Sequence, residues 1–140
     1  MREILFRGKD VGTGKFKQGY YIKGATRHCI TCSLANYPIY DIIPETLGQF
    51  TGLTDKNGIK IFEGDIVKIT DKIVDFETYA FIEFGNPNGQ YNWGWQLVPL
   101  ENKPFAVEIL HWVEMEETGA FIEVVGNIHD NPELLGGADK

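Results

Sequence analysis

The chain has 140 residues, of which 43% are hydrophobic, 13% aromatic and 24% charged. This length and composition are enough for one domain with its own core, and they argue against intrinsic disorder. Thirteen basic and twenty acidic residues give a formal net charge of −7, which disfavours non-specific binding to a phosphate backbone unless the cations are clustered.

The first residues read MREILFRGKD and lack the apolar core of a signal peptide. No apolar run approaches the roughly 20 residues that a membrane-spanning helix needs. The sequence therefore predicts a cytoplasmic protein without membrane contact.

Short runs of β-forming residues recur along the chain, separated by Gly, Asn, Asp and Pro. No segment keeps helical apolar spacing over three turns, so the chain is predicted to be mainly β. The expected strands are 4–6, 18–22, 29–33, 40–43, 49–53, 59–62, 65–70, 78–84, 93–98, 106–113 and 121–125. After them, residues 131–137 read NPELLGG and predict one short helical turn, because Asn can cap it, Pro suits its first position and Gly ends it.

Acidic and amide residues crowd the segment 51–67, TGLTDKNGIKIFEGDIV. A calcium loop starting at Asp55 is excluded, because Ile59 and Lys60 stand where that loop needs a polar ligand and a glycine. Asn57-Gly58 instead suits a tight hairpin turn, with Asp55 accepting hydrogen bonds from turn amides. Leu53, Ile59 and Ile61 are then expected on one face of the hairpin, and Gly64-Asp65 at a second reversal of the chain.

The two cysteines, Cys29 and Cys32, form a lone CxxC with a histidine before it, and both are expected to be reduced. Structural zinc would need another ligand, such as His111 or His129. In a strand the two thiols point to opposite faces, so packing is the simpler interpretation. We predict no metal and no cofactor.

Three aromatic residues, Tyr91, Trp93 and Trp95, share one face if their segment is a strand. Such a row either binds a ligand or belongs to the core. Because no Lys or Arg lies between Asp75 and Glu101, a binding site here favours a protein or peptide over nucleic acid.

Basic residues are concentrated near the N-terminus, where the first 28 residues contain seven of the thirteen cations and only two acids. This asymmetry supports an alternative hypothesis, a nucleic-acid-associated module with a basic N-terminal face. The face would consist of Arg2, Arg7, Lys9, Lys15, Lys17, Lys23 and Arg27.

Catalytic motifs are scarce. Ser33 is the one serine of the chain and has no nucleophile elbow around it. An enzyme centred on His111 or on His129 with its neighbour Asp130 is a third hypothesis, which we rank below the two binding modules. The sequence therefore predicts a protein that is not an enzyme.

Three stretches together resemble a known family: IPETLGQFTGLTDKNGIKIFEGDIVKI at 43–69, ILFRGKD at 4–10 and VVGNIHDNPELL at 124–135. They are similar to the YopX family, small proteins carried mainly by bacteriophages and prophages. The resemblance implies a mainly β fold with an SH3-like rolled β-barrel core. It brings no activity and no site residues.

We therefore expect a single compact domain over residues 1–140, with a barrel core at about 62–127, β-hairpins from residues 1–61 packed on it and the short C-terminal turn. Its expected role is that of a non-enzymatic module that binds a host or phage protein. A homo-oligomeric state of this binding module is left open.

Overall fold

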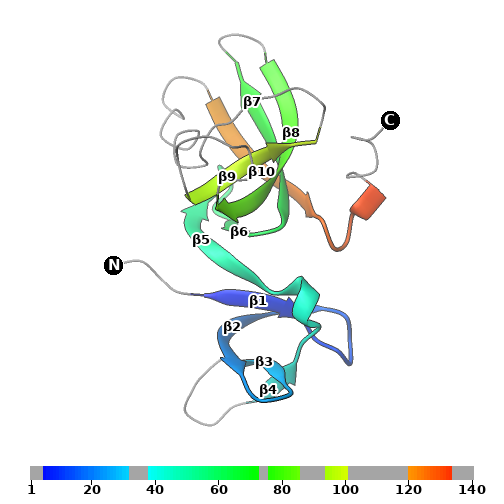
Figure 1. The fold of residues 1–140 in the computed structure, drawn as a ribbon. Helices are drawn as coiled ribbons and strands as arrows, with labels where there is room; N and C mark the ends of the chain where they lie inside the picture. The colour runs from blue at the N-terminus through cyan, green and yellow to red at the C-terminus, as the bar shows by residue number, and fades with distance from the viewer. Residues whose placement is uncertain (1–4, 32–37, 73–75, 86–93, 101–119, 134–140) are drawn as a thin grey trace. The chain divides into compact units, whose positions relative to one another are not determined.

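Short antiparallel strands make up most of the structure, a computed structural model that describes residues 5–31, 38–72, 76–85, 94–100 and 120–133 (Figure 1). The prediction of a mainly β chain is confirmed. The elements are β1 (Phe6–Lys9), β2 (Phe16–Lys23), β3 (His28–Thr31), β4 (Ile39–Asp41), the 3-10 helix η1 (Pro44–Thr46), β5 (Gly48–Thr54), β6 (Lys60–Phe62), β7 (Asp65–Asp71), β8 (Phe76–Gly85), β9 (Gly94–Pro99) and β10 (Ala120–Asn127).

The strands form two sheets, ordered β4-β3-β2-β1-β5-β6 and β10-β7-β8-β9. Among the strands described, neither order joins its two end strands, so both sheets are open. An SH3-like barrel is therefore not confirmed. The predicted strand 106–113 lies outside the described residues.

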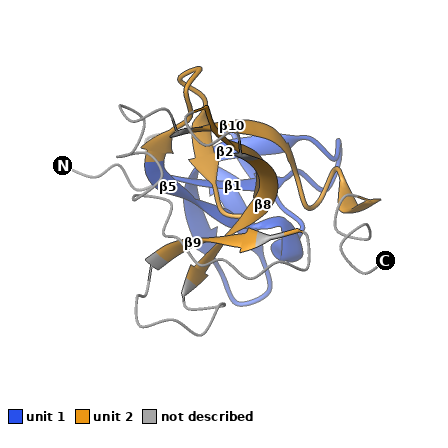
Figure 2. Ribbon diagram, turned by 90° about the horizontal axis from the view of Figure 1, so that it is seen from above, with its two compact units in different colours: residues 1–52 blue, residues 53–140 orange. Residues whose placement is uncertain are grey.

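The chain divides inside β5, between Gly52 and Leu53, into two compact units, unit 1 (residues 1–52) and unit 2 (residues 53–140) (Figure 2). The boundary expected from the sequence lay between residues 61 and 62, and one compact domain stays a prediction. Gly52 has a φ of +89°, a left-handed conformation that glycine adopts without a Cβ clash.

In unit 1, consecutive strands pair in antiparallel register from β1 to β4. The end of β4 then returns to the end of β1, where the amide of Val11 donates to the carbonyl of Asp41 over 2.9 Å. This approach requires glycine at position 8, because a Cβ on Gly8 would lie 2.6 Å from Cδ1 of Ile42.

The first strand differs from its prediction, since β1 occupies Phe6–Lys9 instead of residues 4–6. Residues 7–9 are polar or glycine and have low intrinsic β propensity. They are extended because β2 pairs with them residue by residue, Arg7 with Gln18 and Lys9 with Phe16. Pairing with β2, and not the local sequence, therefore determines where β1 lies.

In unit 2, side chains alternate across the sheet as the β pleat requires. Thr78, Ala80 and Ile82 of β8 are buried, whereas Tyr79 between them is 38% exposed. The core of this unit consists of Ile61, Val67, Ile69, Ala80, Ile82, Leu97 and Ile122.

Asp55 closes the turn between β5 and β6 and is 7% exposed. Its Oδ1 accepts hydrogen bonds from the amides of Asn57 (2.8 Å) and Ile59 (3.0 Å), and Gly58 has a φ of +81°. Its Oδ2 accepts one from the amide of Val124 in β10 over 2.9 Å. The predicted turn role of Asp55 is thus confirmed, and the same carboxylate also joins the turn to a distant strand.

Asp65 has a similar role at the next reversal, where it is 2% exposed and accepts a hydrogen bond from the amide of Phe62 over 2.8 Å. Gly64, between them, has a φ of +90°. One detail of the predicted hairpin is wrong: Ile61 is fully buried, but Ile59 is 49% exposed. Ile59 belongs to the turn that Asp55 organises, so it lies outside the alternation of β6.

At the C-terminal end of β10, Asn127 accepts hydrogen bonds on Oδ1 from the amides of His129 (3.0 Å) and Asp130 (2.8 Å). Helical backbone follows at Pro132 and Glu133. The rest of the predicted helical turn lies outside the described residues.

Candidate interaction surfaces

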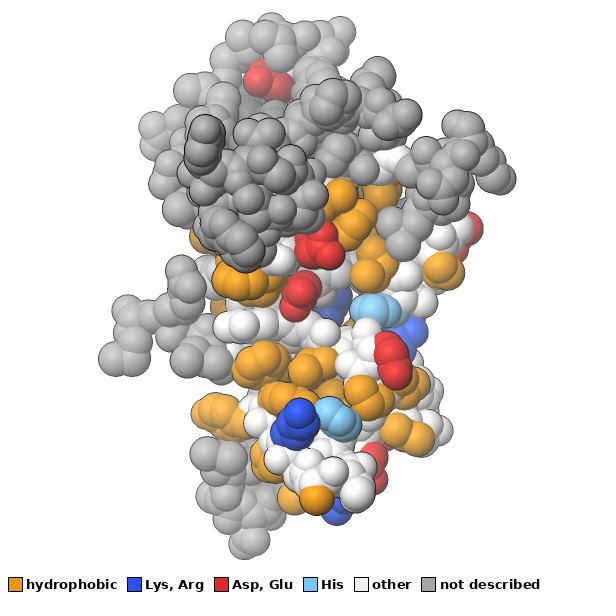
Figure 3. Space-filling view, in the orientation of Figure 1, with side chains coloured by type: hydrophobic (Ala, Val, Ile, Leu, Met, Phe, Trp, Pro, Cys, Tyr) orange, Lys and Arg blue, Asp and Glu red, His pale blue; other side chains and the backbone are white. Residues whose placement is uncertain are grey.

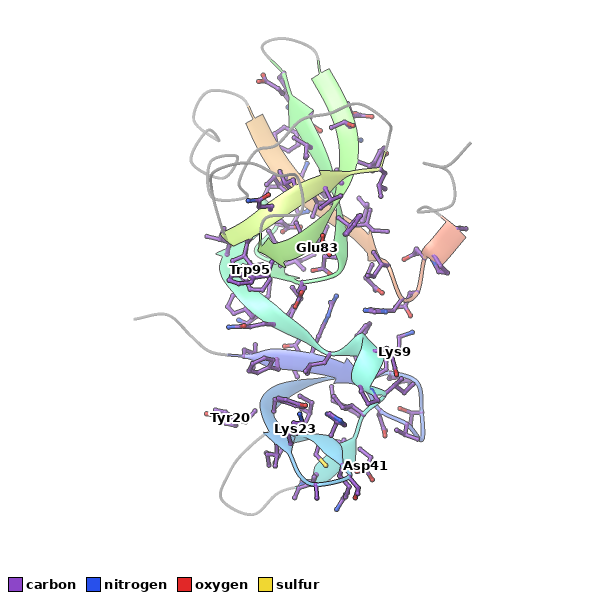
Figure 4. The ribbon with its side chains drawn as sticks, viewed as in Figure 1. Lys9, Tyr20, Lys23, Asp41, Glu83 and Trp95 are labelled. Carbon is purple, nitrogen blue, oxygen red and sulfur yellow. The ribbon has the colours of Figure 1, made fainter. Side chains whose placement is uncertain are left out.

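An aromatic pair occupies the ends of β8 and β9 in unit 2. Phe84 and Trp95 are register partners, with ring centroids 4.8 Å apart and planes at 67°, an edge-to-face contact. Trp95 is half-buried against the core, whereas Phe84 is 57% exposed. Trp95 is labelled in Figure 4 at the start of β9. The other two predicted aromatic residues, Tyr91 and Trp93, lie outside the described residues.

The basic residues of unit 1 are distributed over both faces of its sheet. Arg7 and Lys9, on one face, lie 4.4 and 5.5 Å from the ring centroid of Phe16. Lys17, on the other face, lies 4.6 Å from the centroid of Tyr40. Each contact is a cation–π interaction.

The remaining basic candidates are also separated. Lys15 is in the turn before β2, Lys23 ends β2 and is exposed, and Arg27 bonds to Asp41. Figure 4 shows Lys9 beside η1 and Lys23 beside β2 and β3. Arg2 lies outside the described residues. The structure therefore does not gather these predicted residues into one basic face.

A row of aromatic rings crosses β1, β2 and β3, and sequence reasoning missed it. The Phe6 and Tyr21 rings lie 5.7 Å apart, and the Tyr21 and His28 rings are stacked at 6.0 Å and 14°. Tyr21 Oη and Nδ1 of His28 are hydrogen-bonded at 2.5 Å. The sequence shows on which face of its own strand each residue falls, but it does not show the register between the strands that brings the three rings together.

Cys29 is buried in β3, and its Sγ donates to Oδ1 of Asp41 over 3.4 Å. Burial raises the pKa of the Cys29 thiol, and the hydrogen bond to Asp41 raises it further. The same Oδ1 accepts a hydrogen bond from Nε of Arg27 over 2.8 Å, which lowers the pKa of the Asp41 carboxyl. A thiol with a raised pKa is a poor nucleophile, so this arrangement supports a packing role for Cys29. Cys32 lies outside the described residues.

Two of the three histidines, His28 and His129, lie among the described residues. His129 and Asp130 lie in the turn that Asn127 organises, and Oδ2 of Asp130 accepts a hydrogen bond from Nδ2 of Asn127 over 3.0 Å. His111 lies outside the described residues. Within the described ranges, no three His, Cys, Asp or Glu side chains are placed to hold a metal ion.

These observations define a class: a mainly β protein of two open sheets, with aromatic side chains at its surface in both units. No helix in the described part of the chain is long and apolar enough to cross a membrane. The chain belongs to the YopX family, whose model, described as YopX protein, matches residues 12–136.

The fold is similar to the crystal structure of protein EF1440 from Enterococcus faecalis, with a TM-score of 0.58. The two sequences are 23% identical, and the match covers 96% of this chain and 99% of the other. At that identity the likeness concerns the fold alone. The comparison with curated proteins gives no match.

Proposed function

We propose that this YopX-family chain is a phage or prophage accessory protein, a non-catalytic β module that binds another protein in the bacterial cytoplasm. The observation that carries the proposal is the exposed ring of Phe84 held against half-buried Trp95. Large aromatic side chains on a fixed support are typical anchors of protein interfaces. The proposal keeps Tyr91 and Trp93, which precede Trp95 closely in the sequence, as further aromatic residues of this anchor.

The finer fold in the proposal is an SH3-like rolled barrel in unit 2. It is supported by the outer edge of β10, where the carbonyl of Ile122 accepts from the amide of Lys56 over 3.1 Å. Next to it, the amide of Val124 donates to Asp55. The β5–β6 turn thus satisfies an edge that an open sheet would leave unpaired.

The partner is expected to be basic around an apolar centre. Unit 2 contains six of the thirteen Lys and Arg and sixteen of the twenty Asp and Glu, a formal net charge of −10. A basic rim would be attracted to this unit, and an apolar centre would cover Phe84. In a second copy of the chain, only unit 1 has the positive charge that such a partner needs, because its formal net charge is +3.

The test is an affinity capture from a bacterial lysate, divided into nuclease-treated and untreated halves and analysed by mass spectrometry. The bait is the tagged chain, compared with Phe84→Ala and with the control Ile59→Ala. Ile59 is a second exposed apolar residue of unit 2, 49% exposed. Urea denaturation establishes that both variants fold, and light scattering detects self-association.

We expect a stoichiometric protein partner that survives nuclease, disappears with Phe84→Ala and remains with Ile59→Ala. If every partner is captured equally by both variants, the aromatic pair is only the margin of the core. Partners that vanish with nuclease would refute direct protein binding.

A further inference from the structure

The net charge of the whole chain conceals an opposite charge on unit 1. Seven of the thirteen Lys and Arg fall in residues 1–52, together with four of the twenty Asp and Glu, so unit 1 has a formal net charge of +3. The argument that an acidic protein repels phosphate therefore does not apply to this unit by itself.

The strand register divides the side chains of unit 1 between two faces. Residues paired across antiparallel strands point to the same side, and residues two apart along a strand do so as well. The aromatic–lysine face, as we name it, follows from Phe6 paired with Gly19, Tyr21 with Ile30, and Ile30 with Tyr40. Its side chains are those of Phe6, Lys17, Tyr21, Lys23, His28 and Tyr40, together with Ile30, which is fully buried and offers no surface to a ligand.

No carboxylate lies on the aromatic–lysine face among the described residues of β1 to β4. The Asp41 carboxylate belongs to the opposite face, since Asp41 pairs with Cys29 and accepts its hydrogen bond. In the space-filling view of unit 1, hydrophobic side chains surround a histidine and a Lys or Arg side chain (Figure 3). Hydrophobic and basic side chains are therefore mixed on the part of unit 1 that this view shows.

The rings of the aromatic–lysine face are held at defined positions but are not fully covered. Tyr21, His28 and Tyr40 are all half-buried, which leaves part of each ring accessible. Tyr21 is fixed by its stacking and hydrogen bond with His28, and Tyr40 by the ammonium of Lys17. Lys23 is exposed at the end of β2 and is the register partner of His28.

We propose that the aromatic–lysine face binds single-stranded nucleic acid. Rings spread over adjacent strands offer stacking surfaces for successive bases, and Lys17 and Lys23 supply charge for the phosphates between them. An acidic peptide would use the lysines but has no series of bases to stack on the rings. This site is on unit 1 and is independent of the protein-binding surface proposed around Phe84.

The test is the binding of a fluorescein-labelled oligothymidylate of ten nucleotides, measured by fluorescence anisotropy in 20 and 150 mM salt. With two lysines at phosphates, the logarithm of affinity should fall with the logarithm of salt with a slope of about −1.4. Lys23→Gln should weaken binding about fivefold, as expected for the loss of one exposed ion contact.

Two controls remove the same charge elsewhere. Lys15 is also exposed but lies in the turn before β2, and Lys72 is exposed in unit 2. Both Lys15→Gln and Lys72→Gln should change affinity less than twofold. A ¹H–¹⁵N spectrum of the intact chain, titrated with oligothymidylate, needs no variant and should shift most at residues 17, 21, 23, 28 and 40.

Four results would overturn the proposal. The first is no binding in 20 mM salt, and the second is equal weakening by the control variants, which would indicate non-specific attraction. The third is that a ten-residue polyglutamate displaces the labelled oligothymidylate as well as unlabelled oligothymidylate does, which would show that the face recognises negative charge and not bases. Shifts confined to other residues would also exclude this face.

Discussion

Truncating Asp55 tests whether one buried carboxylate joins the two ends of unit 2. In Asp55→Ala, the amides of Asn57, Ile59 and Val124 lose their acceptor. Asn57 and Ile59 are exposed, so their amides can turn to water, and we assign the two losses about 1 kcal/mol together. Val124 is half-buried, and its loss of a charged acceptor costs about 2 kcal/mol. The free energy of unfolding should fall by about 3 kcal/mol.

The assay is urea denaturation followed by far-UV circular dichroism and by tryptophan fluorescence, which reports on unit 2 because all three tryptophans lie beyond residue 52. With a slope of about 1.5 kcal/mol per molar urea, the midpoint should fall by about 2 M. Asp55→Asn keeps one oxygen but presents an NH₂ group to the other amides, so it should lie between wild type and Asp55→Ala.

Asp10→Ala is the matched control for this prediction. Asp10 also organises a hairpin turn, with Oδ1 accepting from the amide of Gly12 over 3.1 Å and Oδ2 from the hydroxyl of Thr13 over 3.0 Å, but both bonds are exposed. Its truncation should cost less than about 1 kcal/mol. The reasoning is refuted if Asp55→Ala unfolds within about 0.5 kcal/mol of wild type, or if Asp10→Ala is as costly.

Three further predictions concern other sites. In Gly126→Ala the new Cβ would lie 2.5 Å from Oδ1 of Asn131; we expect a loss of about 1–3 kcal/mol, and an unchanged melting temperature would contradict it. The pKa of Asp41 is lowered by Arg27. The ionised carboxylate therefore adds to the stability of the fold above the ordinary Asp pKa of about 3.9, and this stability is lost as the pH falls through the pKa of the folded state. The melting temperature of Asp41→Asn should therefore lie slightly below wild type at pH 7 and converge with it near pH 2, and a gap that persists in acid would exclude this ion pair as its cause. Because burial raises the pKa of Cys29, iodoacetamide should alkylate Cys29 far more slowly in the folded chain than in urea, as peptide mass spectrometry can measure; equal rates would show an accessible thiol.

Local chemistry made the turns of this chain predictable. An Asp two residues before Asn-Gly forms its hydrogen bonds within a few residues, so the role of Asp55 in its turn could be read from the sequence. Its bond to Val124 could not, because 69 positions separate the two residues and no local pattern specifies such a partner. The same limit explains β1, whose polar residues are strand only because β2 pairs with them.

The surfaces show this limit more clearly. Composition identified an excess of cations near the N-terminus, but strand alternation sends Arg7 and Lys17 to opposite faces. The row of Phe6, Tyr21 and His28 depends on the register of three strands, which a sequence specifies only through long-range packing. The exposed ring of Phe84 was missed because alternation alone does not show where a core ends.

The bond between the Asp55 carboxylate and the amide of Val124 also bears on synthesis at the ribosome. The strand pairings of unit 1 all fall between residues 6 and 49, so that sheet can form while the rest of the chain is still being made. Unit 2 cannot complete its sheet until β10 emerges. Before that point Oδ2 of Asp55 cannot accept its hydrogen bond from the amide of Val124, which belongs to β10. Until that moment the β5–β6 turn has its local hydrogen bonds only, and the edge of β7 that β10 later covers keeps its backbone N–H and C=O groups unpaired.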